Sequence, residues 1–171
     1  MPRPSSVNDG TQHPTGFWAE ELVTPYTVFT DAGWDVDVAT PGGRAPTVDK
    51  VSLGDGAGDA DTLARVRAKL DELQPVLSQP LALEEVDDSA YDLVFYPGGH
   101  GPMEDLAVDE ASGRILARRV QDNTPVALLC HAPAAVLAAV GFDFPLANGA
   151  DSLSSGQRRR LLLARARKSG R

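Results

Sequence analysis

The single cysteine of this 171-residue sequence, Cys130, stands where a thiol can become reactive. It follows the apolar residues 126–129, which are typical of a buried strand, and Pro133 suits the first turn of a following helix. A thiol held at such a turn lies close to the unpaired N–H groups of a helix N-terminus, which lower its pKa. The pattern therefore predicts a nucleophile, and a buried structural cysteine is the alternative.

Two neighbouring features can assist this thiol. His131 follows Cys130 directly and can orient or deprotonate it. Residues 91–96 are typical of a strand, and they run into the turn Pro-Gly-Gly-His-Gly at 97–101, a sharp bend that favours glycine. The backbone N–H groups of Gly99 and His131 are therefore expected to face a developing oxyanion.

The elements that must position these groups alternate along the chain. Helical spacing predicts helices over 17–31 (kinked at Pro25), 61–73 (with Pro75 and Pro80 on either side of its exit), 103–121 and 133–140. Strands are predicted over 34–38, 91–96 and 126–129, and a loop over 44–60. This order indicates an α/β fold, a parallel sheet covered by helices on both faces, with its chemistry at the carboxyl ends of the strands. We expect an irregular arm without a strand over 1–16, one domain over 17–145 and a basic tail over 146–171.

Composition narrows the possible functions. Hydrophobic residues make up 42% and charged residues 23%, which is typical of one globular domain, and every apolar run is far shorter than the ~20 residues of a membrane helix. One cysteine excludes an internal disulfide and a multi-cysteine zinc site. Residues 1–157 hold nine basic and 24 acidic residues, a balance that repels phosphate backbones. We therefore expect a cytoplasmic protein with a small substrate and neither a nucleic-acid nor a membrane partner.

Four stretches occur in a specific order and spacing: DGTQHPTGFWAEEL at 9–22, DAGWDVDVATPGG at 31–43, YDLVFYPGGHGPM at 91–103 and ALLCHAPAA at 127–135. Together they resemble the ThiJ/PfpI superfamily, within the class I glutamine amidotransferase-like, flavodoxin-like fold. The resemblance is greatest to the heat-shock chaperone and glyoxalase III branch, and it covers about residues 9–140.

The resemblance implies a set of site residues. Cys130 is the nucleophile, His131 its adjacent histidine, Glu21 the acid that contacts the thiol, and Gly99 a source of the oxyanion contact. His100 lines the same pocket, and a packing or hydrogen-bonding role without catalytic duty is its alternative. Glu20, beside the acid, is most simply a solvated helix residue.

The implied activity is glyoxalase III-like, a hydro-lyase of the stress response. It converts a 2-oxoaldehyde such as methylglyoxal into a 2-hydroxy acid such as lactate, with no cofactor, glutathione or metal, and in a homodimer. The alternative is a stress-response chaperone or thiol sensor in which Cys130 is oxidised to a sulfinate without turnover. An intracellular cysteine peptidase is less favoured, and a glutamine amidotransferase still less, because no histidine follows His131.

The two ends of the chain depart from the resemblance. Family members have an apolar strand before the TGFW-like segment and an acid downstream that orients the histidine. Neither has a recognisable counterpart here, and Asp143 and Asp151 are the only later acids. We therefore expect a sheet incomplete at both ends, with an open edge that favours pairing with another chain. The basic residues 158–168 indicate a tail unrelated to the family's C-terminus, or else a solvated helix or a nucleic-acid or membrane contact.

Overall fold

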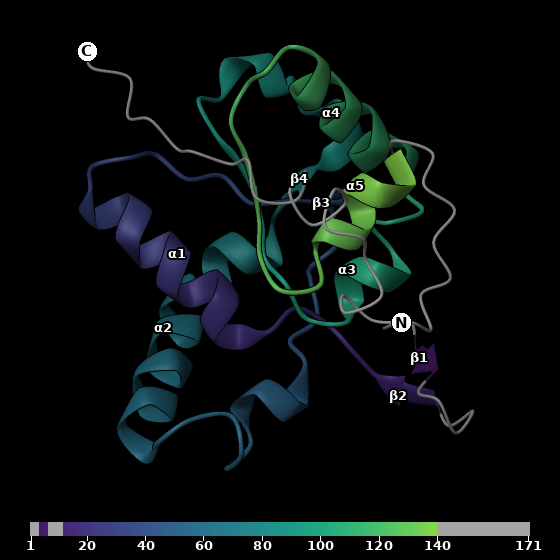
Figure 1. The fold of residues 1–171 in the computed structure, drawn as a ribbon. Coiled ribbons are helices and arrows are strands. Elements are labelled where there is room, and N and C mark those ends of the chain that lie inside the picture. The colour runs from purple at the N-terminus through teal and green to yellow at the C-terminus, as the bar shows by residue number, and fades with distance from the viewer. Residues whose placement is uncertain (1–3, 7–11, 140–171) are drawn as a thin grey trace, which may run out of the picture.

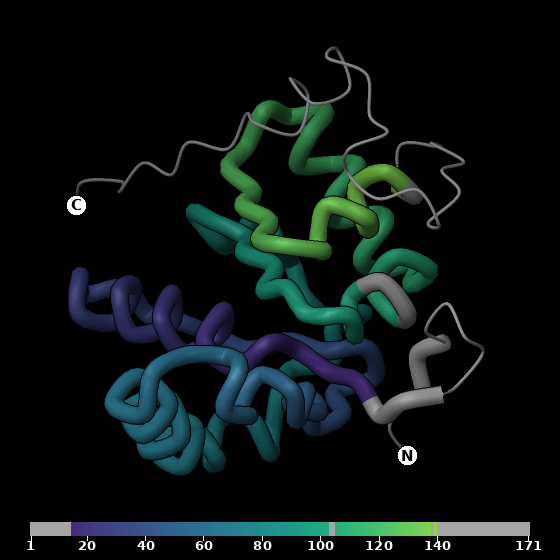
Figure 2. The backbone as a smooth tube through the Cα atoms, turned by 60° about the horizontal axis from the view of Figure 1, so that its bottom comes forward, coloured from purple at the N-terminus to yellow at the C-terminus, as the bar shows by residue number. Residues whose placement is uncertain are grey.

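The computed structural model describes residues 4–6 and 12–139, and within them it has the α/β architecture that the sequence predicts. Two groups of helices lie on either side of short strands (Figure 1), and the turned view in Figure 2 shows the same separation. On one side α1 (Ala19–Asp31) packs on α2 (Ala60–Ser78). On the other side lie α3 (Gly101–Glu104), α4 (Glu110–Gln121) and α5 (Pro133–Ala139).

The strands between the helices form two separate parallel pairs. β3 (Ala39–Thr40) pairs with β4 (Leu81–Ala82), and β5 (Val94–Tyr96) pairs with β6 (Val126–Leu128). The predicted parallel pairing and the last two predicted strands are confirmed. Within the described residues, however, the predicted single sheet is divided, because no strand joins the two pairs.

The strand predicted over 34–38 does not form, and β3 begins only at Ala39. The acidic residues Asp35 and Asp37 are exposed, and the register gives only Ala39 and Thr40 a partner in β4. Alternating apolar residues are not enough for a strand here: the Val38 carbonyl accepts the N–H of Leu81 in β4 at 2.8 Å, but the described structure pairs no strand with residues 34–37.

The N-terminal arm is also different from the prediction. β1 (Pro4–Ser6) and β2 (Gln12–Pro14) pair antiparallel, so the expectation of an arm without a strand was wrong. The sequence between these strands contains the dipeptide Asp9-Gly10, which favours a tight turn between two paired strands.

Burial explains the extent of the helices. α2 begins where the Asp59 carboxylate accepts the N–H of Thr62 at 2.8 Å, and Val66, Leu70, Leu73 and Leu77 pack against α1 at helical spacing. The helix continues through Pro75 to Ser78, beyond the predicted bound at residue 73, and its end lies between Pro75 and Pro80 as predicted. Leu77 is buried in the α1–α2 core, and this packing favours a last helical turn. The helix predicted over 103–121 is divided into α3 and α4.

Short 3-10 helices occupy several of the connections: Pro41–Gly43, Lys50–Leu53, Leu83–Glu85 and Asp88–Ala90. The last of these carries a buried ion pair, in which Arg119 Nε lies 3.0 Å from Asp88 Oδ2. Arg119 also donates to the carbonyls of Tyr91 at 2.8 Å and Pro125 at 3.2 Å, residues that precede β5 and β6. One side chain thus fixes the entry to both strands that carry the site.

Within the described part of the chain, no helix is both long and apolar enough to cross a membrane.

Candidate active site

Cys130 occupies the sharp elbow that the sequence predicts between β6 and α5. Its φ is 57°, in the left-handed region that non-glycine residues seldom adopt, at a cost of about 1–3 kcal/mol. Leu129 N–H donates to the Tyr96 carbonyl at 3.1 Å and Ala132 N–H to the Leu129 carbonyl at 3.0 Å. These bonds hold the strained backbone between the strand and the helix, and the Cys130 side chain remains exposed.

Gly98 allows the carboxylate of Glu21, on α1, to approach Cys130 closely. A Cβ at Gly98 would lie 2.2 Å from Glu21 Oε2 and 2.4 Å from Cys130 Cβ, so only a residue without a side chain fits between them. Its carbonyl accepts the N–H of Trp18 at 3.1 Å, which ties the turn to the start of α1. The close approach explains why the turn after β5 needs a glycine at this position.

Gly99 brings the same turn against Gly16. Its φ is 97°, and a Cβ there would lie 2.5 Å from the Gly16 carbonyl oxygen. The N–H of Gly101 donates to that carbonyl at 3.1 Å. With its backbone held in this way, the Gly99 N–H lies close enough to the thiol of Cys130 to lower its pKa, and so does the N–H of His131.

The surroundings of the thiol raise its pKa. Partial burial is the largest cause, and the nearby Glu21 carboxylate acts in the same direction, while the Gly99 and His131 N–H groups lower the pKa. The predicted lowering of the thiol pKa was therefore wrong. The physical reason is that the backbone N–H groups act in the predicted direction but are outweighed by burial and the carboxylate.

Glu21 lies in the first turn of α1 with one carboxylate oxygen buried. Among the described residues, this Oε2 has no hydrogen-bond partner of ordinary geometry. A buried acceptor beside a thiol is able to take a proton from a reacting group there. Its neighbour Glu20 is exposed, in agreement with the interpretation of Glu20 as a solvated helix residue.

His131 is placed to act on the thiol as a neutral imidazole. Its Nδ1 lies 3.1 Å from Cys130 Sγ. Partial burial lowers the pKa of His131, and the neighbouring His100 lowers it further. A neutral ring at pH 7 is able to accept the thiol proton.

His100 lies close to both His131 and Asp49, an acid that the sequence patterns did not identify. The two histidine rings lie 4.8 Å apart between centroids, and His100 Nδ1 is 3.6 Å from Oδ2 of the buried Asp49. Asp49 also accepts the Val51 N–H at 3.0 Å and the Thr15 hydroxyl at 3.3 Å. Asp49 is in the loop predicted over 44–60, where no periodicity or motif marks it.

The remaining expectations concern a metal ion, the later acids and the tail. In residues 12–139, no group of three His, Cys, Asp or Glu side chains is placed to hold a metal ion. Asp143, Asp151 and the tail over 146–171 lie outside the described residues.

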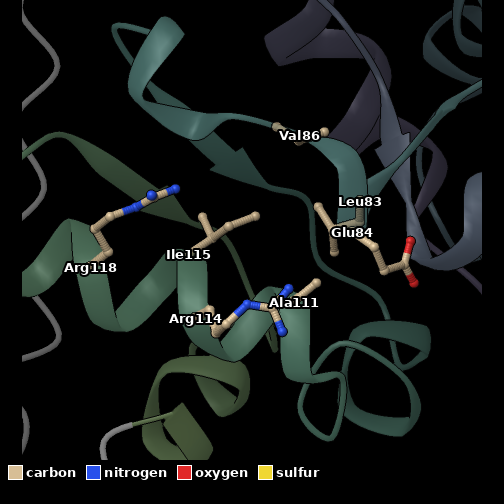
Figure 3. A pocket seen from close by; sticks show the side chains of 7 residues that line it. All are labelled: Leu83, Glu84, Val86, Ala111, Arg114, Ile115 and Arg118. Carbon is tan, nitrogen blue, oxygen red and sulfur yellow. The ribbon is translucent and has the colours of Figure 1, made fainter.

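A separate pocket of about 260 Å³ lies between α4 and the 3-10 helix Leu83–Glu85 (Figure 3). Arg114 and Arg118 line it from α4, and Glu84 from the facing segment. Arg118 is paired with Asp88, and Glu84 accepts the Gly42 N–H at 2.9 Å. Since its lining shares no residue with the Cys130 cluster, this pocket is not part of the candidate active site.

Comparison with known proteins identifies the family. Residues 14–143 match the DJ-1/PfpI family, and the chain therefore belongs to it. The protein/nucleic acid deglycase HchA of Pseudomonas aeruginosa (strain LESB58) is 29% identical over 138 residues, which are 77% of this chain and 45% of that protein. HchA of Staphylococcus aureus (strain bovine RF122 / ET3-1) is 31% identical over 139 residues, 78% of this chain and 46% of that protein. The chain thus spans less than half the length of these relatives.

Solved structures show the same fold. The structure of glyoxalase III from Candida albicans superposes with a TM-score of 0.61 at 20% identity, over 78% of this chain and 55% of that one. The rapid encystment protein of Francisella tularensis superposes with a TM-score of 0.60 at 24% identity, over 79% and 57%. The fold class inferred from the sequence, α/β and flavodoxin-like, and the resemblance to the ThiJ/PfpI superfamily are both confirmed.

Proposed function

We propose that this protein converts 2-oxoaldehydes such as methylglyoxal into 2-hydroxy acids such as lactate, without a cofactor and with Cys130 as the nucleophile. The observation that carries the proposal is the meeting of three groups at one sulfur: the Glu21 carboxylate, His131 Nδ1 and the Gly99 N–H. The names of the deglycase relatives and of the glyoxalase III neighbour support carbonyl chemistry.

In the first step, Cys130 Sγ adds to the aldehyde carbon. His131 accepts the thiol proton and returns it to the carbonyl oxygen, so that the product is a hemithioacetal. Because the Gly99 and His131 N–H groups lie near the sulfur, they are also near the oxygen that becomes negatively charged as the bond forms.

In the second step, the Glu21 carboxylate removes the hydrogen of the former aldehyde carbon as a proton. The resulting enediol takes a proton at the neighbouring carbon, which leaves a 2-hydroxy thioester on Cys130. One carbon is oxidised while its neighbour is reduced, so the step needs no external oxidant or reductant. Water then hydrolyses the thioester and restores the thiol.

The test is lactate formation from methylglyoxal by the 171-residue chain, without glutathione or added metal. We expect turnover in the wild type and in Glu20→Gln, and none in Cys130→Ser or Glu21→Gln. Circular dichroism checks that the variants are folded. No lactate from a folded wild-type chain, or undiminished turnover in Cys130→Ser, contradicts the proposal.

A thiol sensor is the second candidate, because the Cys130 side chain is exposed and backbone N–H groups face its sulfur. In that role peroxide oxidises Cys130 to a sulfinate, which mass spectrometry detects as the gain of two oxygen atoms. Oxidation at low peroxide together with absent lactate formation supports the sensor.

Methylglyoxal-treated protein serves as a further substrate in the lactate assay, since the relatives are called protein/nucleic acid deglycases. The homodimer and the cytoplasmic location stay predictions.

A further inference from the structure

The place of the Glu21 carboxylate depends on how the start of α1 is held, because Glu21 lies in the first turn of this helix. Trp18, the residue at the N-terminal boundary of α1, makes no side-chain hydrogen bond to the helix. Instead, the Ala19 N–H donates to the hydroxyl oxygen of Ser52 at 3.0 Å. Since the first N–H groups of a helix have no partner within it, a serine 33 residues further along the chain acts as the cap.

Ser52 is itself held in one orientation. The residue is 2% exposed, its hydroxyl donates to the Asp49 carbonyl at 2.5 Å, and its N–H donates to the same carbonyl at 3.0 Å. Because a hydroxyl has a single proton, and this one is directed at Asp49, the oxygen is left to accept the N–H of Ala19. Both hydrogen bonds of this buried hydroxyl are therefore specified.

The turn that carries the serine is anchored to the segment before α1. The Asp49 N–H donates to the Phe17 carbonyl at 2.9 Å, and the Phe17 N–H donates to the Thr47 carbonyl at 2.9 Å. These bonds form a parallel bridge between Phe17 and Val48. A displacement of Ser52 relative to this bridge would therefore be passed on to the first turn of the helix.

The second anchor of α1 is the glycine turn beside the thiol. The Trp18 N–H donates to the Gly98 carbonyl at 3.1 Å, and Gly98 separates Glu21 Oε2 from the Cβ of Cys130. One hydrogen bond at Gly98 fixes a point of the chain, whereas a second one at the next N–H also fixes the direction in which the helix starts. The bond to Ser52 is this second one.

We propose that Ser52 is a positioning residue of the active site, which through the start of α1 holds the Glu21 carboxylate against the Cys130 thiol. The importance of this placement for turnover rests on the proposed function, in which Glu21 takes a proton from the substrate. The placement itself can be tested without turnover, because the carboxylate also acts on the thiol.

The test is the rate at which iodoacetamide alkylates Cys130 at pH 7 in Ser52→Ala. In the wild type the charge of Glu21 raises the pKa of the thiol, which slows alkylation, and complete removal of this charge is expected to speed the reaction about fivefold. A withdrawal of the carboxylate from about 4 to about 8 Å halves the Coulomb energy. The effect on the rate is then the square root of the full effect, so Ser52→Ala should react about twofold faster.

A second background separates positioning from a general loosening of the fold. In Glu21→Gln there is no charge to displace, so the addition of Ser52→Ala should leave the alkylation rate unchanged. A loosened fold would expose the thiol and speed alkylation in both backgrounds. Ser112→Ala is the matched control, because Ser112 is equally buried and its hydroxyl bonds to Tyr96; we expect the wild-type rate.

Two further measurements complete the test. Lactate formation should fall at least about tenfold in Ser52→Ala, since the misplaced carboxylate no longer reaches the substrate. Amide exchange followed by NMR tests the contact in the wild type, and therefore also decides where Ser52→Ala does not fold. The Ala19 N–H should exchange at least about tenfold more slowly than in the unfolded chain.

The other outcomes overturn the proposal. Alkylation of Ser52→Ala at or below the wild-type rate shows that Ser52 does not place the carboxylate, and an equal increase in both backgrounds shows a purely structural role. Rapid exchange of the Ala19 N–H removes the contact on which the proposal depends. If the wild-type chain forms no lactate, the proposed function fails, while the alkylation rates still decide the role of Ser52.

Discussion

Replacement of Glu21 by glutamine removes the negative charge beside the Cys130 thiol with little change of shape. Burial is the largest cause of the raised thiol pKa, and the Glu21 carboxylate adds to it through its charge. Without this charge the thiol pKa falls. We therefore expect Glu21→Gln to increase the thiolate fraction at neutral pH, where the wild-type thiol is mostly protonated.

The geometry sets the size of the effect. Glu21 Oε2 and Cys130 Cβ lie 2.2 and 2.4 Å from the same point, the Cβ position at Gly98, so the charge is close to the sulfur. Two unit charges about 4 Å apart interact by about 1 kcal/mol in surroundings like water and about 4 kcal/mol near a protein surface. Because the Cys130 side chain is exposed, the lower figure applies. It corresponds to about fivefold more thiolate.

The assay is the rate of alkylation by iodoacetamide as a function of pH. At pH 7 we expect Glu21→Gln to react about five times faster than the wild type, and Glu20→Gln to react at the wild-type rate. Lactate formation should be lost in Glu21→Gln although its thiol is more reactive. Slower alkylation of Glu21→Gln would refute the reasoning, because it would show a protonated Glu21 that donates to the thiolate.

Three further changes test other parts of the structure. Gly98→Ala should abolish lactate formation, since its Cβ would displace the buried carboxylate, whereas Gly113→Ala on α4, where a Cβ meets open space, should leave activity unchanged. Arg119→Met should lower the free energy of unfolding in urea by about 3 kcal/mol, because it removes the buried partner of Asp88 and leaves only the partly exposed Arg118 beside that carboxylate; a loss below 1 kcal/mol would contradict this. His100→Gln should raise the pKa of His131 in an NMR titration, since His100 lowers it; an unchanged or lower value would contradict the assigned cause.

The site could be predicted from sequence where local patterns specify it. An apolar run followed by Cys130-His131 and a helix-starting proline determines an elbow, because neighbouring residues alone set that conformation. The glycine turn after β5 is predictable for the same reason. The shift of the thiol pKa could not be predicted in this way. Its direction depends on burial and on Glu21, which lies more than a hundred residues earlier in the chain.

Asp49 and the strand expected over 34–38 show what local sequence patterns cannot predict. Asp49 belongs to an aperiodic loop, and only the fold brings its carboxylate to His100. Residues 34–38 have a strand-like alternation, yet a strand exists only where a neighbour accepts its hydrogen bonds. Likewise, α2 extends through Pro75 because Leu77 is buried against the core, which outweighs the local preference of proline.

The sequence by itself determined the α/β class and the elbow at Cys130 and His131, because periodicity, turn residues and a strand–cysteine–helix order are properties of adjacent residues. Tertiary structure decided the direction in which the thiol pKa shifts, the Asp49–His100 contact and the division of the strands into two separate pairs. Those features depend on distances between segments far apart in the chain, and such distances are set by packing of the whole domain.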